Sequence, residues 1–222
     1  MKVLITSGGC KVPIDEVRHI GNFSSGRYGS ELADEFLKNG HDVIFFSEKG
    51  SKEPKFFYTD MYHVPINPKI IKYKDYYEYL TVKEIITREQ PDIIISAAAI
   101  SDYVLDKTEG KISSENEELV IKLRKGEKVL QSFRDLAPKA LIVGFKLLVG
   151  PTVDEKYKAI YKQLKHVDIT VYNDLSKLRN GESGRELIFW AENNRIGSVK
   201  NMSVEDVVDE ILAEAFVKEK LK

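Results

Sequence analysis

The residues between Gly8 and Gly29 constrain the fold of this chain more than any other stretch. They follow an apolar run at 3–5 that is typical of a buried strand. They precede a segment in which Leu32 and Phe36 recur at helical spacing. The stretch is therefore predicted to be a long loop that joins a strand to a helix. α/β proteins bind phosphate groups at such loops, because glycines let the backbone approach the ligand and the helix start offers free N–H groups.

The spacing of the glycines does not by itself name the ligand. Gly21 to Gly26 fits the spacing of a P-loop, but Arg27-Tyr28 stands where Lys-Ser/Thr is expected. The short Gly-x-Gly-x-x-Gly pattern of dinucleotide-binding folds is absent. The residues alone indicate an anion or nucleotide site and leave a glycine-rich turn without a ligand as the alternative. A dense set of anion-binding side chains favours the site: Arg18, Asn22, Ser24, Ser25 and Arg27.

Composition and charge exclude several classes of protein. The 222 residues are 42% hydrophobic and 31% charged, with a net charge of -1, which gives no electrostatic case for binding nucleic acid or an anionic membrane. Cys10 is the one cysteine and no signal peptide or membrane-spanning run is evident, so we expect a cytoplasmic protein without disulfides. The four histidines are scattered, so no metal site is predicted.

Strand and helix patterns alternate along most of the chain. This order predicts a Rossmann-like, doubly wound α/β fold, with a mostly parallel sheet and helices on both faces, in a single domain over 1–222. The predicted strands are 2–7, 42–47, 56–66, 92–96, 140–146 and 167–171. The predicted helices begin near Gly26 and Ser203 and span 73–88, 129–136 and 152–164.

Two segments depart from this alternation. Leu119, Ile121 and Leu123 alternate with polar residues, and 111–114 is a candidate partner strand, which predicts a β-hairpin or flap inserted at about 104–125. A plain surface hairpin is the alternative. The segments 186–190 and 194–199 predict a second hairpin before the last helix.

Residues at the predicted strand ends add candidate ligand groups. Ala97, Ala98 and Ala99 follow a buried strand and leave room for a ligand, and Asp102 adds a carboxylate that could instead be a helix cap or a surface group. Glu48 follows another strand, in a charged turn where we expect it to be solvated.

Several of these motifs resemble phosphopantothenoylcysteine synthetase, also called phosphopantothenate–cysteine ligase, an amide ligase of coenzyme A biosynthesis. The resemblance begins in the loop and continues in order along the chain, and it points to a stand-alone form without a fused flavin decarboxylase domain. The residues that carry it are Gly8-Gly9, Val17-Arg18, Asn22 to Arg27, Gly29, Ala97 to Tyr103, Lys111, Val143 to Lys146 and Asn173 to Leu175.

The resemblance implies a reaction in two steps. The carboxylate of 4′-phosphopantothenate attacks the α-phosphate of CTP or ATP and pyrophosphate leaves. The amine of L-cysteine then attacks the acyl-nucleotide and releases the nucleoside monophosphate. Mg²⁺ is expected on the pyrophosphate, a homodimer is implied, and the base remains open with a lean to CTP.

The resemblance also assigns residues to roles. Asn22 would hydrogen-bond the acyl-nucleotide and Lys111 would close over the triphosphate, so both are candidate catalytic residues. The nucleotide would contact Gly8, Ser24, Gly26, Gly29, Phe145 and Asn173. Phosphopantothenate would contact Ala98, Ala99 and Asp102, with its phosphate on Arg18 across a dimer interface.

Two features differ from the family pattern, and two other functions compete. Cys10 stands where the family usually has Thr, which suggests an alkylatable thiol, and the flap has fewer lysines near Lys111 than the fused bacterial enzymes. A nicotinamide-dependent Rossmann oxidoreductase is one rival, although Tyr157 is followed four residues later by Tyr161 rather than by Lys. A nucleotide-binding module without catalysis is the other rival.

Overall fold

A central sheet organises the computed structural model, which describes residues 1–55, 57–58, 65–180, 185–191, 195–200 and 202–220. The sheet has eight strands in the order β14-β13-β12-β11-β8-β1-β4-β7. The strands from β7 to β12 are parallel, and β13 and β14 form an antiparallel hairpin at one edge. Its strands are β1 (Lys2–Ser7), β4 (Asp42–Glu48), β7 (Lys69–Tyr73), β8 (Ile93–Ser96), β11 (Leu141–Leu148), β12 (Ile169–Asp174), β13 (Arg185–Ala191) and β14 (Arg195–Lys200).

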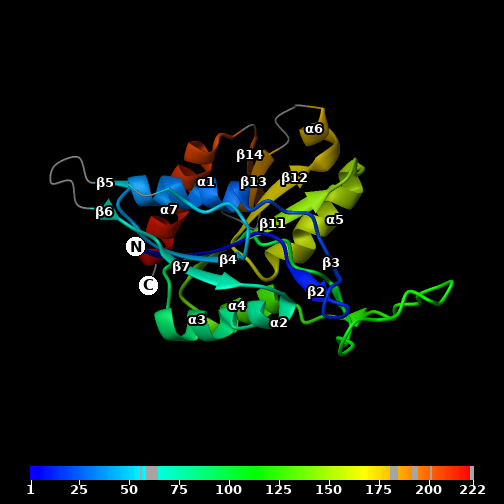
Figure 1. Ribbon diagram of the computed structural model, residues 1–222. Helices are drawn as coiled ribbons and strands as arrows, with labels where there is room; N and C mark the ends of the chain where they lie inside the picture. Colours follow the sequence, from blue (N-terminus) through cyan, green and yellow to red (C-terminus); the bar gives the residue numbers. More distant parts are fainter. Residues whose placement is uncertain (56, 59–64, 181–184, 192–194, 201, 221–222) are drawn as a thin grey trace.

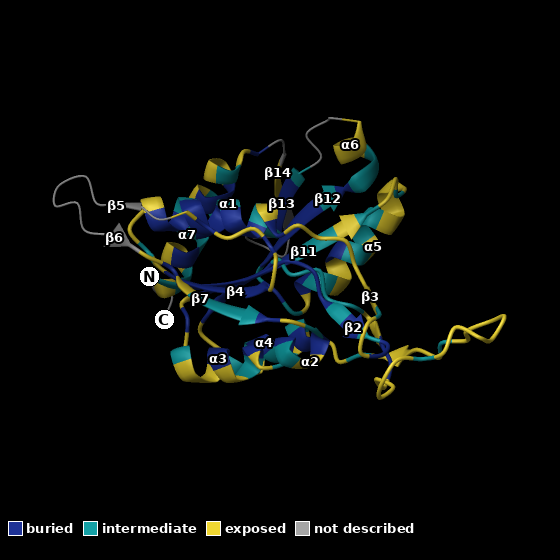
Figure 2. Ribbon diagram, in the orientation of Figure 1, coloured by how far each residue is buried: buried dark blue, intermediate teal, exposed yellow. Residues whose placement is uncertain are grey.

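Helices cover both faces of this sheet, as the doubly wound prediction requires (Figure 1). One face packs against α1 (Arg27–Lys38) and α7 (Val204–Lys220), through Leu32, Phe36 and Ile211. The opposite face packs against α2 (Tyr76–Tyr79), α3 (Val82–Glu89), α4 (Val129–Leu136) and α5 (Val153–Leu164). A short α6 (Leu175–Arg179) follows β12. The sheet itself is the most buried part of the chain (Figure 2).

The central positions of β1 and β8 in the sheet follow from the apolar residues of these strands. Val3 and Ile5 pack with the α1 layer while Leu4 packs with the other, so β1 is apolar on both faces, as a central parallel strand must be. The same holds for the run at 93–95 in β8. Both strands therefore lie at the centre of the sheet.

Two predictions near residue 70 are wrong. Within the described residues, the strand expected at 56–66 is only a short pair, β5 (Phe57–Tyr58) with β6 (Pro65–Ile66), and residues 56 and 59–64 lie outside the described part. The edge strand of the main sheet is β7 instead. The helix expected at 73–88 begins only at Tyr76, because Tyr73 ends a strand and the Asp75 carboxylate caps α2, and it is divided at residues 80–81 into α2 and α3.

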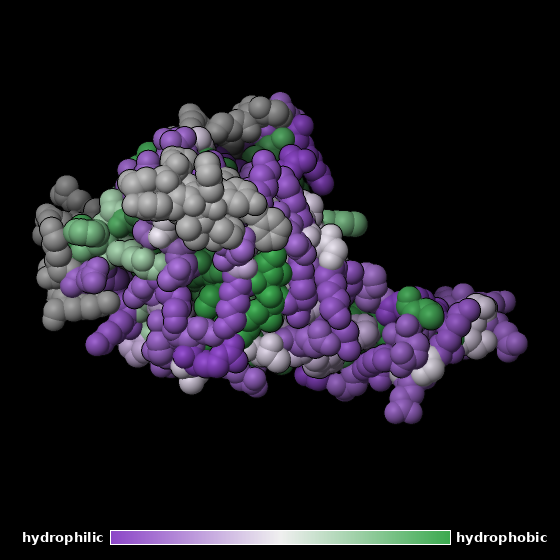
Figure 3. Space-filling model, turned by 60° about the vertical axis from the view of Figure 1, so that its left-hand side comes forward, coloured by the Kyte–Doolittle hydropathy of each residue, from purple (hydrophilic) through white to green (hydrophobic). Residues whose placement is uncertain are grey.

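The inserted hairpin is also corrected. The expected strands at 111–114 and 119–124 do not pair; β9 (Tyr103–Val104) pairs with β10 (Arg124–Lys125), and residues 105–123 between them form an extended arm. The arm projects from the body and is mostly exposed (Figure 2). Its surface is mainly hydrophilic, with a small hydrophobic cluster part-way along (Figure 3). Alternation along 119–123 failed as a strand signal because none of the described strands lies beside it.

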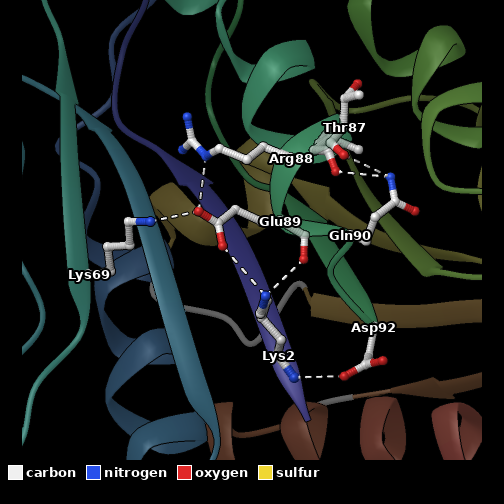
Figure 4. A network of polar contacts seen from close by, with 8 residues as sticks. Lys2, Lys69, Thr87, Arg88, Glu89, Gln90 and Asp92 are labelled. Carbon is white, nitrogen blue, oxygen red and sulfur yellow. Dashed lines mark hydrogen bonds and ion pairs between the residues drawn. The ribbon is translucent and has the colours of Figure 1, made fainter.

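A polar network lies at the amino-terminal ends of the strands and joins helix α3 to the sheet. Glu89 at the end of α3 accepts from Lys2 of β1, Lys69 of β7 and its neighbour Arg88 (Figure 4). These hydrogen bonds, led by that from Lys69, lower the pKa of the Glu89 carboxyl to about 2. The backbone N–H of Lys2 donates to Asp92 at 2.7 Å. The network joins α3 to two strands that are not neighbours in the sequence.

No helix in the described ranges is long and apolar enough to cross a bilayer.

Candidate functional site

The carboxyl ends of β1 and β8 lie side by side at the centre of the sheet. Here the chain order reverses, since β4 and β7 follow on one side and β11 and β12 on the other. Ligands of open α/β sheets bind outside such a reversal point. Beyond the two strands the backbones continue together, because Gly9 forms a β-bridge with Ala99, and the Ala99 N–H donates to the Gly8 carbonyl at 2.9 Å. Ala98 lies in the same half-buried loop.

The glycines of the first loop bring helix α1 close to strand β1. A Cβ at Gly29 would lie 2.4 Å from the Ser7 hydroxyl oxygen, and a Cβ at Gly8 would lie 2.0 Å from the Ser51 hydroxyl oxygen. Gly26, the residue before α1, has a φ of 71°, which suits glycine. The Ser7 hydroxyl donates to the Gly26 carbonyl at 3.1 Å. The start of α1 is thereby fixed directly above the end of β1.

The positive end of α1 is available to an anion. Gly26 provides no side-chain cap, and the first turn of the helix contains no acidic residue. Ser24 is exposed, and its hydroxyl accepts from the Gly26 N–H at 3.4 Å. Free N–H groups and the helix dipole stabilise negative charge at this position. The arrangement suits the phosphate site that the loop predicted.

Tyr73, the last residue of the edge strand β7, holds the start of the first loop by hydrogen bonds. Its buried hydroxyl lies 2.9 Å from the carbonyl oxygens of both Ser7 and Gly9. Burial raises the pKa of Tyr73 well above its ordinary value, so the hydroxyl keeps its proton and serves as a donor. Tyr76 and Tyr79 are also buried, whereas Tyr77 is partly exposed. Tyr73, Tyr76 and Tyr79 therefore belong to the core.

Asn22 joins the first loop to the loop after β8. Its side-chain amide donates to the Ile100 carbonyl at 3.1 Å, and Asn22 itself is exposed. Asp102 follows in the same loop, largely exposed, and its carboxylate pairs with Lys128. The structure thus brings Asn22 to the loop that contains Ala98, Ala99 and Asp102.

Phe145 and Asn173 lie on the face of the sheet that packs against α1. Phe145 packs in the same layer as Val171, and Asn173 is two residues beyond Val171 on β12, so strand alternation puts it on that face too. The ring of Phe145 meets the ring of Tyr28, from the first turn of α1, edge-on at 5.6 Å between centroids. Tyr28 therefore connects the glycine loop to the proposed nucleoside side of the site.

Sequence reasoning missed Arg185 beside this group. Arg185 of β13 pairs in register with Asn173, and its guanidinium lies 3.8 Å from the centre of the Tyr28 ring. The Arg185 Nε and the Tyr28 hydroxyl are buried and have no hydrogen-bond partner among the residues that the structure describes. Burial raises the pKa of Tyr28 to about 12, against a lowering effect of the Arg185 charge. No motif could identify Arg185, because the sheet register alone brings it to Asn173.

Arg18 and Lys111 are brought together by backbone contacts. Arg18 ends the turn between β2 (Lys11–Pro13) and β3 (His19–Gly21). Its Nη2 donates at 2.5 Å to the carbonyl of Ile112, the residue after Lys111. Lys111 itself is exposed on the arm. The two cations predicted to serve substrate and nucleotide phosphates thus belong to one local unit.

Glu48 is not solvated, which corrects the prediction made for it. It is 6% exposed at the end of β4. Its carboxylate accepts from Lys11 at 2.6 Å and from the Ser51 hydroxyl at 3.2 Å. Both faces of β4 are buried near its end, so the Glu48 side chain is enclosed by the protein. The charged residues beside Glu48 in the sequence do not reveal this burial. Lys11 is thereby held beside the glycine loop.

Cys10 does not offer the expected reactive thiol. It is fully buried among the apolar residues below the β2–β3 hairpin. Burial raises the pKa of its thiol to about 12, with smaller effects from a Ser101 backbone hydrogen bond and two acidic residues. The thiolate is the reactive form, so the group is inert at neutral pH. In the described ranges, no group of three or more His, Cys, Asp or Glu residues could hold a metal ion.

Comparison with known proteins decides the family. Residues 1–217 match the family described as the DNA/pantothenate metabolism flavoprotein C-terminal domain. The chain belongs to this family. The match spans the loop, both strand ends and the arm described above.

Curated members of the flavoprotein C-terminal domain family have related sequences. The coenzyme A biosynthesis bifunctional protein CoaBC of Methanocaldococcus jannaschii is 34% identical over 214 residues, which cover 95% of this chain and 50% of that protein. Phosphopantothenate–cysteine ligase 1 of Arabidopsis thaliana is 29% identical over 220 residues, covering 78% and 69%. The chain spans about half the length of the CoaBC relatives it matches.

Solved structures confirm the Rossmann-like fold. The DNA/pantothenate metabolism flavoprotein from Streptococcus pneumoniae has a TM-score of 0.78 and 25% identity, covering 98% of this chain and 99% of that one. A Cab2 mutant in complex with phosphopantothenate-cysteine has a TM-score of 0.77 and 24% identity, covering 99% and 87%. The latter supports the fold alone.

Proposed function

We propose that this protein is a phosphopantothenate–cysteine ligase, which joins 4′-phosphopantothenate to L-cysteine through an acyl-nucleotide. The observation that supports it most is that three segments predicted to share one site are bonded to one another. Asn22 of the first loop donates to Ile100 after β8, and Arg18 of the same loop donates to Ile112 of the arm. The names of the relatives supply the reaction class.

The proposed first step needs two anions held close together. The substrate carboxylate attacks the α-phosphate of CTP or ATP, and the bond from that phosphate to the pyrophosphate breaks. The uncapped end of α1, with Gly8, Ser24, Gly26 and Gly29 around it, would receive phosphate oxygens. Lys111 would add positive charge over the triphosphate, and such fixed charge stabilises the transition state. Mg²⁺ would arrive on the triphosphate itself, and we assign it no protein ligand.

In the proposed second step, the cysteine amine attacks the acyl carbon, and the nucleoside monophosphate leaves as the amine loses its proton. Asn22 would donate to the acyl-nucleotide, since its neutral amide adds no charge to a mixed anhydride. Ala98, Ala99 and Asp102 would line the phosphopantothenate site. Phe145 and Asn173 would hold the nucleoside. Positioning both reactants in this way accounts for much of the rate that such ligases need.

We further propose a cytoplasmic homodimer in which Arg18 serves the substrate phosphate at the subunit boundary. The hairpin loop and the arm expose apolar side chains that a second copy would cover: Val17, Ile20, Phe23, Leu119, Val120 and Leu123. Phe23 is fully exposed. Sedimentation velocity tests this, and a monomer at micromolar concentration would contradict it.

Pyrophosphate release tests the proposed function directly. CTP and ATP are supplied separately with Mg²⁺ and phosphopantothenate, with and without cysteine. We expect a burst of about one equivalent without cysteine and continuous turnover with it. The nucleotide that gives the faster release of pyrophosphate identifies the preferred base. Release that is independent of phosphopantothenate, or no release from folded protein, would reject the ligase.

The Lys111→Gln variant refines the same assay. It should slow the pyrophosphate burst and leave the melting temperature unchanged, because Lys111 is exposed. Lys122→Gln, on another exposed position of the arm, is the matched control. An unchanged burst in Lys111→Gln would remove that residue from the site.

A further inference from the structure

Asp15 is a buried carboxylate at the turn of the β2–β3 hairpin, and no step of the proposed reaction uses it. It is 2% exposed. Its Oδ1 accepts from the backbone N–H groups of Val17 and Arg18 at 2.9 and 2.8 Å. Contacts of this kind close a tight turn locally. They occupy only one of the two carboxylate oxygens.

The second oxygen of Asp15 reaches outside the hairpin. Oδ2 accepts from Arg18 Nε at 2.9 Å and from the backbone N–H of Ile112 at 3.1 Å. Arg18 Nη2 then donates to the carbonyl of the same Ile112. Both backbone polar groups of Ile112 are therefore bound by a single ion pair. The residue that precedes Ile112 is Lys111.

Further bonds fasten the arm on the other side of Lys111. The Glu16 N–H donates to the Gly110 carbonyl at 3.0 Å, and the Thr108 N–H donates to the Ile14 carbonyl at 2.9 Å. The backbone at 108–112 thus runs along the hairpin turn, while the rest of the arm projects away (Figure 1). Lys111 belongs to the fastened part.

The Asp15 carboxylate is suited to holding groups and not to transferring protons. Burial acts to raise its pKa, but the hydrogen bonds from Val17, Ile112 and Arg18 prevail and lower it to about 2. The group is therefore ionised at any physiological pH. Its contacts use Nε and Nη2 of Arg18, and a guanidinium carries two more N–H groups on Nη1. Arg18 can be held by Asp15 and still present donors to a phosphate.

We propose that Asp15 is a positioning residue, which holds Arg18 and the backbone beside Lys111 as one unit so that the two cations act together. This inference rests on the proposed ligase function. It predicts that loss of the Asp15 charge reduces the contribution of Lys111 to pyrophosphate release. Asp15 and Lys111 carry opposite charges and Lys111 itself is left intact, so the effect arises from the position of the arm.

The Asp15→Asn variant tests the contact without any assay of activity. An asparagine has one acceptor oxygen and no charge, so it cannot accept from both the turn N–H groups and the donors Arg18 Nε and Ile112 N–H, and the ion pair that holds Ile112 is lost in either orientation. Hydrogen–deuterium exchange of the Ile112 amide should become at least tenfold faster. Arg18→Lys, which keeps a charge but loses the forked geometry, should also speed exchange there. It serves as the second variant if Asp15→Asn folds poorly.

Asp168→Asn is the matched control. Asp168 accepts from Arg134 at 2.6 Å, from the Ile142 N–H at 2.7 Å and from Lys218 at 2.9 Å. It directly precedes β12, so it lies at the amino-terminal ends of the strands, opposite the glycine loop. Asp168→Asn removes a carboxylate that, like Asp15, accepts from an arginine and a backbone N–H, although Asp168 is less buried. Its exchange at Ile112 should equal that of the unmodified protein.

The kinetics of the pyrophosphate burst then test whether Asp15 acts through Lys111. Asp15→Asn should slow the burst at least tenfold, and the Asp15→Asn/Lys111→Gln double variant should be no more than twofold slower than Lys111→Gln alone. Unchanged exchange at Ile112 in Asp15→Asn, or fully multiplicative losses in the double variant, would overturn the inference. An inactive unmodified protein would instead reject the ligase function, and the exchange data would still decide whether Asp15 holds the arm.

Discussion

The side-chain amide of Asn22 donates a hydrogen bond to the carbonyl oxygen of Ile100, across the boundary between the first loop and the loop after β8. An aspartate at this position has no N–H to donate and adds a negative charge. We expect Asn22→Asp to lower kcat/KM by about a hundredfold, the scale seen when one catalytic hydrogen-bond donor is removed.

Stability separates this effect from a folding defect. Asn22 is exposed, so the melting temperature of Asn22→Asp should stay close to that of the unmodified protein. Asn22→Ala removes the donor without adding charge and should be less impaired than Asn22→Asp. Equal turnover in Asn22→Asp and the unmodified enzyme would show that Asn22 has no role in the reaction.

Gly29 should resist substitution by alanine even though it lies in a helix. Elsewhere in a helix, replacing Gly by Ala raises stability by about 1 kcal/mol. Here the new Cβ would lie 2.4 Å from the Ser7 hydroxyl oxygen and 2.8 Å from its Cβ. Overpacking of this kind costs about 1–3 kcal/mol, so chemical denaturation should show a less stable protein.

The Ser7→Gly substitution provides the rescue for Gly29→Ala. It removes both atoms that the new Cβ would meet. The double variant should therefore lose less stability than the sum of the two single losses. Strictly additive losses would mean that the Gly29 contact with Ser7 does not limit the packing of α1 on β1.

Tyr28 should tolerate, or gain from, loss of its hydroxyl. That hydroxyl is buried and has no hydrogen-bond partner in the described part of the chain, a state that costs about 1–3 kcal/mol. Phenylalanine keeps an aromatic face for Arg185, whose guanidinium lies 3.8 Å from the ring centre. Tyr28→Phe should have a free energy of unfolding equal to or higher than that of the unmodified protein. A loss of more than 1 kcal/mol would indicate that the hydroxyl is bonded in the native state.

Glu89 should make stability depend on pH in the acid range. Its pKa in the folded protein is about 2, below the ordinary value of 4.5, chiefly because Lys69 and Arg88 donate to the carboxylate. A lowered pKa stabilises the fold above pH 4.5, and this contribution disappears as pH falls towards 2. Melting temperatures of the unmodified protein and Glu89→Gln should differ most near neutrality and converge towards pH 2.

A neighbouring site controls for general acid effects on Glu89. Glu84→Gln removes a carboxylate from an exposed position of the same helix without touching the bonds from Lys2, Lys69 and Arg88, and is the matched control. A constant difference between Glu89→Gln and the unmodified protein from pH 7 to pH 2 would contradict the role assigned to the Glu89 carboxylate.

Cys10 should be unreactive until the protein unfolds. Its thiol is fully buried, and its pKa is raised to about 12. Iodoacetamide at pH 8 should label less than a tenth of the native protein in the time that it labels the urea-unfolded protein completely. Rapid labelling of the native protein would show that the hairpin above Cys10 opens readily.

Local sequence patterns were sufficient for much of the sheet and for the ends of its strands. Apolar runs at 3–5 and 93–95 gave β1 and β8, because strands buried on both faces must be apolar throughout. The segment 186–190, predicted as one strand of a hairpin, gave β13. Of the residues expected to bind ligands, Gly8, Ala98 and Ala99 follow β1 and β8 within three residues, so their grouping at one edge of a parallel sheet could be predicted. Their roles in the reaction are still predictions.

The same local patterns failed where neighbouring segments decide the structure. Alternation at 119–123 predicted a strand, but a strand needs a partner, and within the described ranges none pairs with these residues. β7 was missed because an edge strand is only partly buried and its apolar signal is short. Glu48 and Cys10 were misjudged because burial depends on which segments fold over a residue, and not on its sequence neighbours.

The sequence by itself thus determined most of the alternation of strands and helices, the glycine-rich loop at the end of β1 and the family to which the chain belongs. The tertiary structure alone decided that Asp15 reaches Ile112, that Arg185 lies over Tyr28, and that Glu48 is buried beside Lys11. Hydrophobic periodicity is a property of neighbouring residues, so a sequence displays it. Contacts between residues far apart in the chain form only when packing and sheet register bring their segments together.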